Sequence, residues 1–205
     1  MLQFNALRPA TLDVLKVTMN EPLLNDFVLV GGTCLALHYG HRISEDIDLF
    51  VWQKFDVDYF LMELSKTLQF TIKIKTPIGS HIFINGVKTD ILYFPAKPIQ
   101  PVIKEEGVRL LSTADIAAMK MNTIANRGAK KDFYDVYYLL KEYSLSDQIK
   151  FFKQKFSTQD LFGLQRSLNY FADADRQEDP ILLKDKSLTW EKVKRTIIEE
   201  TRKLL

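Results

Sequence analysis

Residues 27–51 read FVLVGGTCLALHYGHRISEDIDLFV, in which a pair of glycines follows an apolar run. The apolar run Phe27–Val30 before the pair predicts a short buried strand. The pair itself, Gly31-Gly32, permits a tight turn, because a residue without a Cβ accepts backbone angles that other residues avoid. Thr33 has N-cap chemistry and predicts a helix that continues to Tyr39. The segment therefore predicts a strand, a glycine turn and a helix in succession.

Two carboxylates, Asp46 and Asp48, alternate with apolar residues at the end of this segment. Successive side chains of a strand point to opposite faces, so a strand over Asp46–Val51 places both acids on one face and Ile47 and Leu49 on the other. Two such acids stand about 6.5 Å apart along the strand, close enough to reach shared divalent cations. The pair therefore predicts a metal site.

The glycine turn predicts a phosphate site beside these acids. Backbone N–H groups at the start of a helix bind phosphate oxygens, with the positive end of the helix dipole behind them, and the Thr33 hydroxyl offers one further donor. Because a nucleoside triphosphate is polyanionic, a bound Mg²⁺ is needed to bridge it to aspartates. We expect Gly31, Gly32 and Thr33 to bind the phosphates of an NTP, with Mg²⁺, or Mn²⁺ in its place, as cofactor.

A third carboxylate, Asp90, lies inside the run VKTDILYF at residues 87–94, which also predicts a strand. Acidic residues are depleted in strands and costly to bury, and metal binding would explain an acid at this position. We expect Asp46, Asp48 and Asp90 to be the catalytic residues and the metal ligands. Arg42, on the loop before Asp46, is a candidate contact for phosphate or base.

The segment Gly31–Phe50 and the run Lys130–Leu140 together resemble the AbiEii/AbiGii-type nucleotidyltransferases. These are toxins of bacterial toxin–antitoxin and phage-defence systems, within the DNA polymerase β-like superfamily. The resemblance implies transfer of an NMP from an NTP to a hydroxyl of RNA, with tRNA favoured, or of a protein, and a cognate antitoxin as partner. It also implies that a lysine and acidic residues on adjoining helices complete the nucleotide site. The matching residues are Lys120, Arg127, Lys131, Asp132 and Asp135.

These downstream residues also have structural interpretations. Lys120 falls on a helix with a buried face, and its ammonium can reach a triphosphate or extend to water. Asp132 and Asp135 share a helical face and can hold Lys120 or Arg127 in place. Lys131 can bind a nucleic-acid backbone or cap the preceding helix.

Two rival motifs are weaker. Cys34, His38 and His41 have partly suitable spacing for a metal, but no fourth ligand follows, and Cys34 is better explained as a small core residue. Asp56 and Asp58 repeat the spacing of the aspartate pair, yet they open a predicted helix, where capping explains them. We interpret both motifs as structural.

Composition agrees with a compact intracellular enzyme. The chain has 205 residues, of which 46% are hydrophobic, and this excludes a disordered protein. Residues 1–100 carry 9 Lys+Arg against 10 Asp+Glu, and residues 101–205 carry 19 against 16, a slight basic excess that suits a polyanion such as RNA. The single cysteine fits a reducing compartment. With no signal peptide or membrane span in the sequence, we expect a cytoplasmic protein without membrane partners.

The whole pattern predicts an α+β fold. A nucleotidyltransferase-type mixed β-sheet with flanking helices is expected in residues 1–111, and a C-terminal helical bundle that contributes to the nucleotide cleft in residues 112–205. Asn85-Gly86 predicts a hairpin, and three prolines in Pro95–Pro101 mark the boundary. The further predicted strands are Phe70–Lys75, His81–Asn85, Val87–Phe94 and Val108–Leu111. The predicted helices are Pro9–Met19, Val57–Leu68, Ile116–Asn126, Lys131–Tyr143, Ser146–Phe156, Thr158–Ala172 and Leu188–Leu204.

Two other functions use the same residues. A non-catalytic nucleotide- or RNA-binding module of this fold is expected to have lost one of its acids, whereas the set here is complete. A metal-dependent phosphohydrolase would release phosphate or nucleoside monophosphate without labelling an acceptor. Product analysis separates the three functions.

Overall fold

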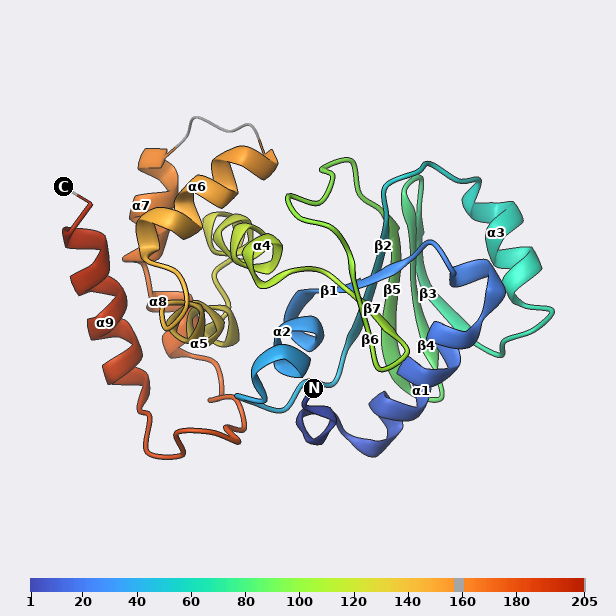
Figure 1. Ribbon diagram of the computed structural model, residues 1–205, viewed down its shortest axis with the longest axis horizontal. Helices are drawn as coiled ribbons and strands as arrows, with labels where there is room; N and C mark the ends of the chain where they lie inside the picture. Colours follow the sequence, from blue (N-terminus) through green and yellow to red (C-terminus); the bar gives the residue numbers. More distant parts are fainter. Residues whose placement is uncertain (157–160, 205) are drawn as a thin grey trace. The chain divides into compact units, whose positions relative to one another are not determined.

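The computed structural model describes residues 1–156 and 161–204 and divides into two compact units, Met1–Ser112 and Thr113–Leu205 (Figure 1). The first unit combines a mixed sheet with helices, and the described part of the second is helical. The predicted α+β class, with a mixed sheet followed by a helical bundle, is confirmed. The division falls one residue beyond the expected limit between residues 111 and 112.

The first unit is built on a seven-stranded sheet, counted over the described residues, with the strand order β3-β4-β5-β2-β1-β7-β6. β2 pairs antiparallel with β1 and parallel with β5, so the strand of the aspartate pair lies between the strand before the glycines and the strand of Asp90. The strands are β1 (Val28–Val30), β2 (Ile47–Val51), β3 (Thr71–Thr76), β4 (Gly79–Ile84), β5 (Val87–Tyr93), β6 (Ile103–Glu105) and β7 (Val108–Leu110).

Burial along β2 follows the predicted alternation. Ile47 and Leu49 are completely buried, whereas Asp48 and Phe50 are partly exposed. β1 is buried throughout, as its continuous apolar sequence predicts. β2 therefore packs one face into the core and turns Asp48 to the other.

The helices of the first unit are η1 (Phe4–Ala6), α1 (Pro9–Asn20), η2 (Pro22–Leu24), α2 (Gly31–Tyr39) and α3 (Val57–Leu64). α1 packs on β5 and β7, and α2 on β1 and β2. The Asp56 side chain caps α3 by accepting a hydrogen bond from the Tyr59 N–H at 2.9 Å, which confirms its structural interpretation. α3 ends four residues before the expected Leu68, because the backbone tightens there into i→i+3 hydrogen bonds.

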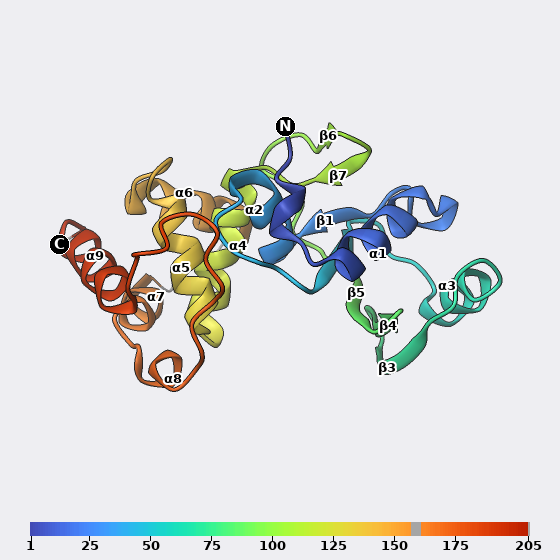
Figure 2. The same cartoon turned by 90° about the horizontal axis from the view of Figure 1, so that it is seen from below.

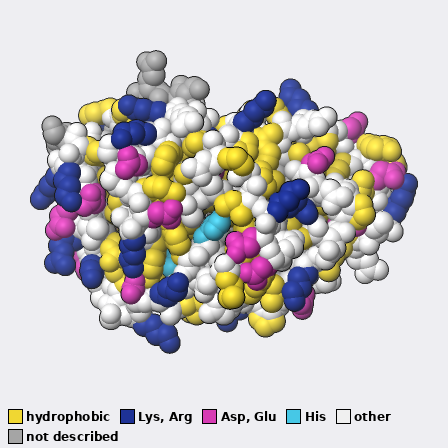
Figure 3. Space-filling view, viewed as in Figure 1, with side chains coloured by type: hydrophobic (Ala, Val, Ile, Leu, Met, Phe, Trp, Pro, Cys, Tyr) yellow, Lys and Arg dark blue, Asp and Glu magenta, His cyan; other side chains and the backbone are white. Residues whose placement is uncertain are grey.

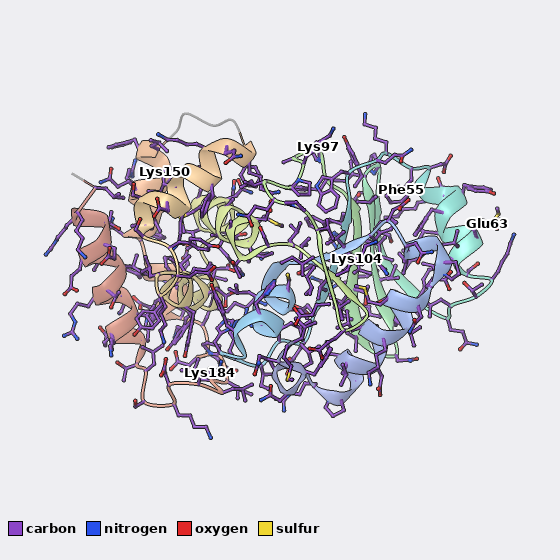
Figure 4. All side chains as sticks on the ribbon, in the orientation of Figure 1. Phe55, Glu63, Lys97, Lys104, Lys150 and Lys184 are labelled. Carbon is purple, nitrogen blue, oxygen red and sulfur yellow. The ribbon has the colours of Figure 1, made fainter. Side chains whose placement is uncertain are left out.

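Two contacts near β2 complete this part of the core. Phe55, labelled in Figure 4, precedes α3 and packs its ring 5.5 Å from that of Phe27 and 4.9 Å from that of Phe60. Trp52 donates its indole N–H to the Ala96 carbonyl at 2.8 Å, which ties β2 to the loop after β5.

Arg109 on β7 holds the segment that precedes β1. Its guanidinium donates to the carbonyl oxygens of Phe27 at 2.8 Å and of Met19 and Leu24 at 3.0 Å each. Burial lowers the pKa of Arg109, although the nearby carboxylate of Asp26 opposes the shift. The three bonds satisfy backbone acceptors near the ends of α1 and η2.

Asn85 and Gly86 form the turn between β4 and β5 with φ of 48° and 78°, the left-handed angles of a two-residue hairpin, so this prediction is confirmed. β3 extends the same sheet as an edge strand, with an irregularity between Ile72 and Ile74. Figure 2 shows β3 and β4 at one end of the sheet with α3 beyond them.

In the second unit, α4 packs against α5, α6 and α7, and α5 packs against α8 and α9. The helices are α4 (Thr113–Asn126), α5 (Lys130–Leu139), α6 (Leu145–Phe156), α7 (Leu161–Leu168), α8 (Ala172–Asp175) and α9 (Trp190–Arg202). The predicted helix Thr158–Ala172 begins outside the described residues, and its described part ends at Leu168, before the separate short α8. A buried ion pair joins α4 and α6, with Lys155 Nζ 2.7 Å from Asp115 Oδ1.

Trp190 anchors an aromatic cluster in this unit. Its ring centroid lies 5.8 Å from those of Phe133 and Tyr134 and 5.7 Å from that of Phe171. Its indole N–H donates to Asp175 at 2.7 Å. Burial raises the pKa of Tyr134 to about 12, with a contribution from Asp179. The cluster buries the first turns of α5 and α9 against each other.

Charged side chains are dispersed over the surface. Figure 3 shows Lys and Arg scattered over the face in view, with acidic and hydrophobic side chains between them. None of the described helices has the length and apolar content needed to cross a bilayer.

Candidate active site

The glycine pair allows two charged side chains to approach the backbone closely. Gly31 begins α2 with φ +70°, and a Cβ there would overlap the carboxylate of Asp48. A Cβ on Gly32 would stand 2.6 Å from Nη2 of Arg42. α2 thus starts two residues earlier than expected, and the glycines contribute its first N–H groups, which lack acceptors within a helix.

Thr33 is buried, and its hydroxyl is engaged within the protein. It lies 2.9 Å from the Ser44 hydroxyl and donates to the carbonyl of Asp46. These bonds tie α2 to the segment that leads into β2. The hydroxyl expected to donate to phosphate thus has partners within the protein in this structure, and the backbone N–H is the other group that Thr33 can offer a ligand.

Asp48 and Asp90 are neighbours across adjacent strands. They occupy the same register position of the parallel pair β2 and β5, so their side chains leave the same face of the sheet. Asp48 is also opposite Val30, the residue before the glycine pair, in the register of β1 and β2. Asp46 directly precedes β2 and is partly exposed. The structure thus brings Gly31, Asp48 and Asp90 together.

Asp90 has two basic neighbours. Its Oδ1 lies 2.7 Å from Nδ1 of His81, the residue opposite on β4, and its Oδ2 lies 3.2 Å from Nζ of Lys88. Burial disfavours the Lys88 ammonium, but the carboxylate of Asp90, with smaller contributions from Asp46 and Asp48, raises the pKa of Lys88. Each of the three acids therefore helps to stabilise the Lys88 ammonium.

Sequence reasoning missed both basic neighbours. Lys88 stands two residues before Asp90 and shares its strand face, a signal that was available in the sequence. His81 comes from the paired strand, and only the register identifies it.

The donor chemistry of the three aspartates fits a hard divalent cation, since all offer carboxylate oxygens and Asp48 and Asp90 occupy matching positions of adjacent strands. In their present conformations, no three His, Cys, Asp or Glu side chains within residues 1–156 and 161–204 are grouped to hold a metal ion.

The second unit contains a buried charge cluster formed by three of the predicted nucleotide-site residues. Lys120 Nζ on α4 lies 2.8 Å from Asp132 Oδ1 and 2.6 Å from Asp135 Oδ2, both on α5. All three side chains are less than a tenth exposed. The two aspartates hold Lys120, as one of the two interpretations expected.

The remaining predicted residues differ in exposure. Arg42 is buried, packs over Gly32 and donates to the Ile43 carbonyl at 3.0 Å. Arg127 and Lys131 are exposed, and Arg127 lines a shallow pocket of about 120 Å³ within the second unit.

The rival metal motif is structural. Cys34 donates its thiol to the Leu111 carbonyl at 3.4 Å, and His38 Nε2 lies 2.9 Å from the same oxygen. Cys34 is completely buried, as its interpretation as a core residue expected.

Comparison with known proteins identifies the family. Residues 13–203 match the family described as nucleotidyl transferase AbiEii toxin, type IV TA system. The chain belongs to this AbiEii family. The resemblance read from Gly31–Phe50 and Lys130–Leu140 is confirmed, and the protein is a nucleotidyltransferase of a toxin family.

Relatives of this AbiEii protein include an uncharacterized protein, aq_aa25, of Aquifex aeolicus (strain VF5), which is 31% identical over 189 residues. That match covers 88% of this chain and 89% of the relative. The solved structure of JHP933 from Helicobacter pylori has a TM-score of 0.57 at 21% identity, covering 97% of this chain and 93% of that one. A putative nucleotidyltransferase from the same species has a TM-score of 0.50 at 20% identity, covering 99% and 97%. These two structures share the fold.

We expect Gly31→Ala to lower the transfer activity of this AbiEii protein at least about tenfold, because small displacements of a reacting group are costly in rate. The added Cβ displaces the Asp48 carboxylate. The matched control is Gly86→Ala, which has a similar φ of +78° but nothing within 4 Å of the added Cβ. Both variants lose roughly 1 kcal/mol of stability to the left-handed backbone. Equal activity of the two variants, measured with labelled NTP, would contradict the role of the turn.

Proposed function

We propose that this protein is a Mg²⁺-dependent nucleotidyltransferase that moves an NMP from an NTP to a hydroxyl of RNA, with tRNA favoured, or of a protein, and releases pyrophosphate. The observation that carries the proposal is the register of Asp48 with Asp90, with the Asp48 carboxylate directed at Gly31. Carboxylates beside an open helix start combine the two requirements of this reaction, cation binding and phosphate binding.

Asp46, Asp48 and Asp90 would hold the cation, which supplies positive charge for the phosphates and acidifies the acceptor hydroxyl when bound. The acceptor oxygen forms a bond to the α-phosphorus while the bond from that phosphorus to the pyrophosphate oxygen breaks. Asp90 takes the proton of the hydroxyl. The backbone N–H groups of Gly32 and Thr33 bind the negative charge that develops on the pyrophosphate.

For the second unit, the proposal rests on the family resemblance. It assigns Lys120, Arg127 and Lys131 to the nucleotide phosphates, where their charges would oppose those of the ligand. Asp132 and Asp135 would act through Lys120, whose ammonium they hold. The family description also supports a cognate antitoxin as partner.

The test is incubation of the protein with each of the four α-labelled NTPs, Mg²⁺ and total cellular RNA or protein. We expect label in one acceptor pool, equimolar pyrophosphate, and loss of both products when EDTA is present. Labelled nucleoside monophosphate without a labelled acceptor would identify a phosphohydrolase instead. Recovery of bound, intact NTP would identify a non-catalytic module, and either result would overturn the proposal.

A further inference from the structure

The strand order indicates from which side of Asp48 and Asp90 the acceptor approaches. If the glycine turn binds the leaving pyrophosphate, as the proposed function requires, the attacking oxygen must approach from the opposite side, because the attacking and leaving oxygens lie roughly in line. The turn follows β1, and Asp90 lies on β5, two strands away across β2. The sheet continues beyond Asp90 into β4 and β3. The acceptor side is therefore the face of β5, β4 and β3.

Basic and aromatic side chains share this face. Phe83 on β4 is opposite Lys88 on β5, just as His81 is opposite Asp90, so all four side chains leave the face of the acids. Lys73 on β3 places its Nζ 5.7 Å from the centroid of the Phe83 ring, which puts it on the same face. Lys73 is exposed, and Phe83 and Lys88 are partly exposed.

We name Lys73, Phe83 and Lys88 the basic–aromatic strip. An aromatic ring between two ammonium groups matches a single nucleic-acid strand, because a base stacks on the ring while lysines pair with backbone phosphates. One end of the strip is the Lys88 ammonium, 3.2 Å from Asp90, the proposed acceptor of the hydroxyl proton. The strip thus leads to the point where a terminal hydroxyl would react.

We propose that the basic–aromatic strip binds the acceptor of the reaction and that this acceptor is a single-stranded end of a nucleic acid. The inference rests on the proposed function for the direction of attack. It goes further by choosing nucleic acid over protein and by naming the residues that select it.

The test is binding of a fluorescently labelled single-stranded RNA to the full chain without NTP, measured by anisotropy. We expect Phe83→Ala and Phe83→Leu each to weaken binding about tenfold, because both remove the flat ring on which a base stacks. Lys73→Ala should weaken binding and reduce the dependence of the affinity on salt by about one phosphate contact. Phe83→Leu keeps apolar bulk, so an unchanged melting temperature separates lost binding from lost folding.

Lys75→Ala is the matched control. Lys75 lies on the same strand as Lys73 and carries the same charge, but it pairs with Asp58 at the start of α3. We expect binding within twofold of the unmodified protein, about the scatter of a neutral surface change. Equal weakening by Lys73→Ala and Lys75→Ala would mean that charge alone attracts RNA, and would overturn the inference.

Two further outcomes separate this inference from the proposed function. Efficient NMP transfer to a protein, with no RNA binding, would overturn the inference and leave the nucleotidyltransferase assignment intact. RNA binding that depends on Phe83, without NMP transfer to any acceptor, would overturn the proposed function and with it the acceptor role of the strip.

Discussion

Replacing Asp46 or Asp48 with asparagine is expected to lower NMP transfer about a thousandfold, because several kcal/mol of charge stabilisation in the transition state depend on carboxylate ligands. The melting temperature should stay nearly unchanged. Asparagine matches aspartate in volume, and both positions are partly exposed. The measurement combines transfer of label from an α-labelled NTP with thermal unfolding of the same preparations.

Asp56→Asn is the matched control for these variants. Asp56 begins a second aspartate pair with the same spacing, but its carboxylate caps α3. Asparagine caps a helix about as well as aspartate, so both stability and activity should be retained. Full activity in Asp46→Asn or Asp48→Asn would refute the assignment of the catalytic acids.

Lys120→Met is expected to lower the free energy of unfolding by about 3–5 kcal/mol, because it removes the ammonium that two buried carboxylates contact. Asp132 and Asp135 are almost completely excluded from solvent and both contact the Lys120 ammonium. Urea denaturation of the purified protein measures the loss. Lys131→Met, which removes an exposed lysine from the same helix pair, should change stability by less than about 0.5 kcal/mol.

Neutralising Asp132 and Asp135 as well shows whether the stability lost in Lys120→Met is electrostatic or comes from a packing defect. The combined variant Lys120→Met, Asp132→Asn, Asp135→Asn should recover much of the lost stability, since it neutralises the two carboxylates together with the ammonium that they contact. If the folded combined variant has lost NTP affinity, the ammonium contributes to nucleotide binding as well as to the fold. Unchanged stability of Lys120→Met alone would contradict the role of the charge cluster.

Local sequence determined much of the first unit. Asp48 alternates with Ile47 and Leu49, so only one face of this strand is apolar and can be buried. The structure buries that face. Asn85 and Gly86 tolerate left-handed backbone angles, and the hairpin forms there. Such features depend on a few consecutive residues, so their prediction needed no knowledge of the tertiary fold.

Contacts between distant residues could not be predicted in this way. The register of Asp48 with Asp90 joins strands far apart in the chain, and the sequence supplied both acids without showing that they are neighbours. Asp115 and Lys155 form a buried pair that no spacing rule connects. Arg109 serves three carbonyls that precede it by more than 80 residues. In each case the partner is fixed by packing, which a local pattern does not encode.

The Thr33 hydroxyl shows a second limit of prediction from the sequence. A threonine after a glycine turn offers a donor at the right place for phosphate, but the sequence could not show that Ser44 and the Asp46 carbonyl would use it. A polar group that is suitably placed for a ligand is equally suited to the protein's own loops.

Each unit carries one of the two tryptophans of the chain, Trp52 in the first and Trp190 in the second. Their surroundings differ, since Trp52 bonds a loop carbonyl and Trp190 stacks in an aromatic cluster beside two lysines. Fluorescence of Trp52→Phe therefore reports on the helical unit alone, and fluorescence of Trp190→Phe on the sheet unit alone. Together they reveal whether the two units melt as one cooperative block or in separate steps.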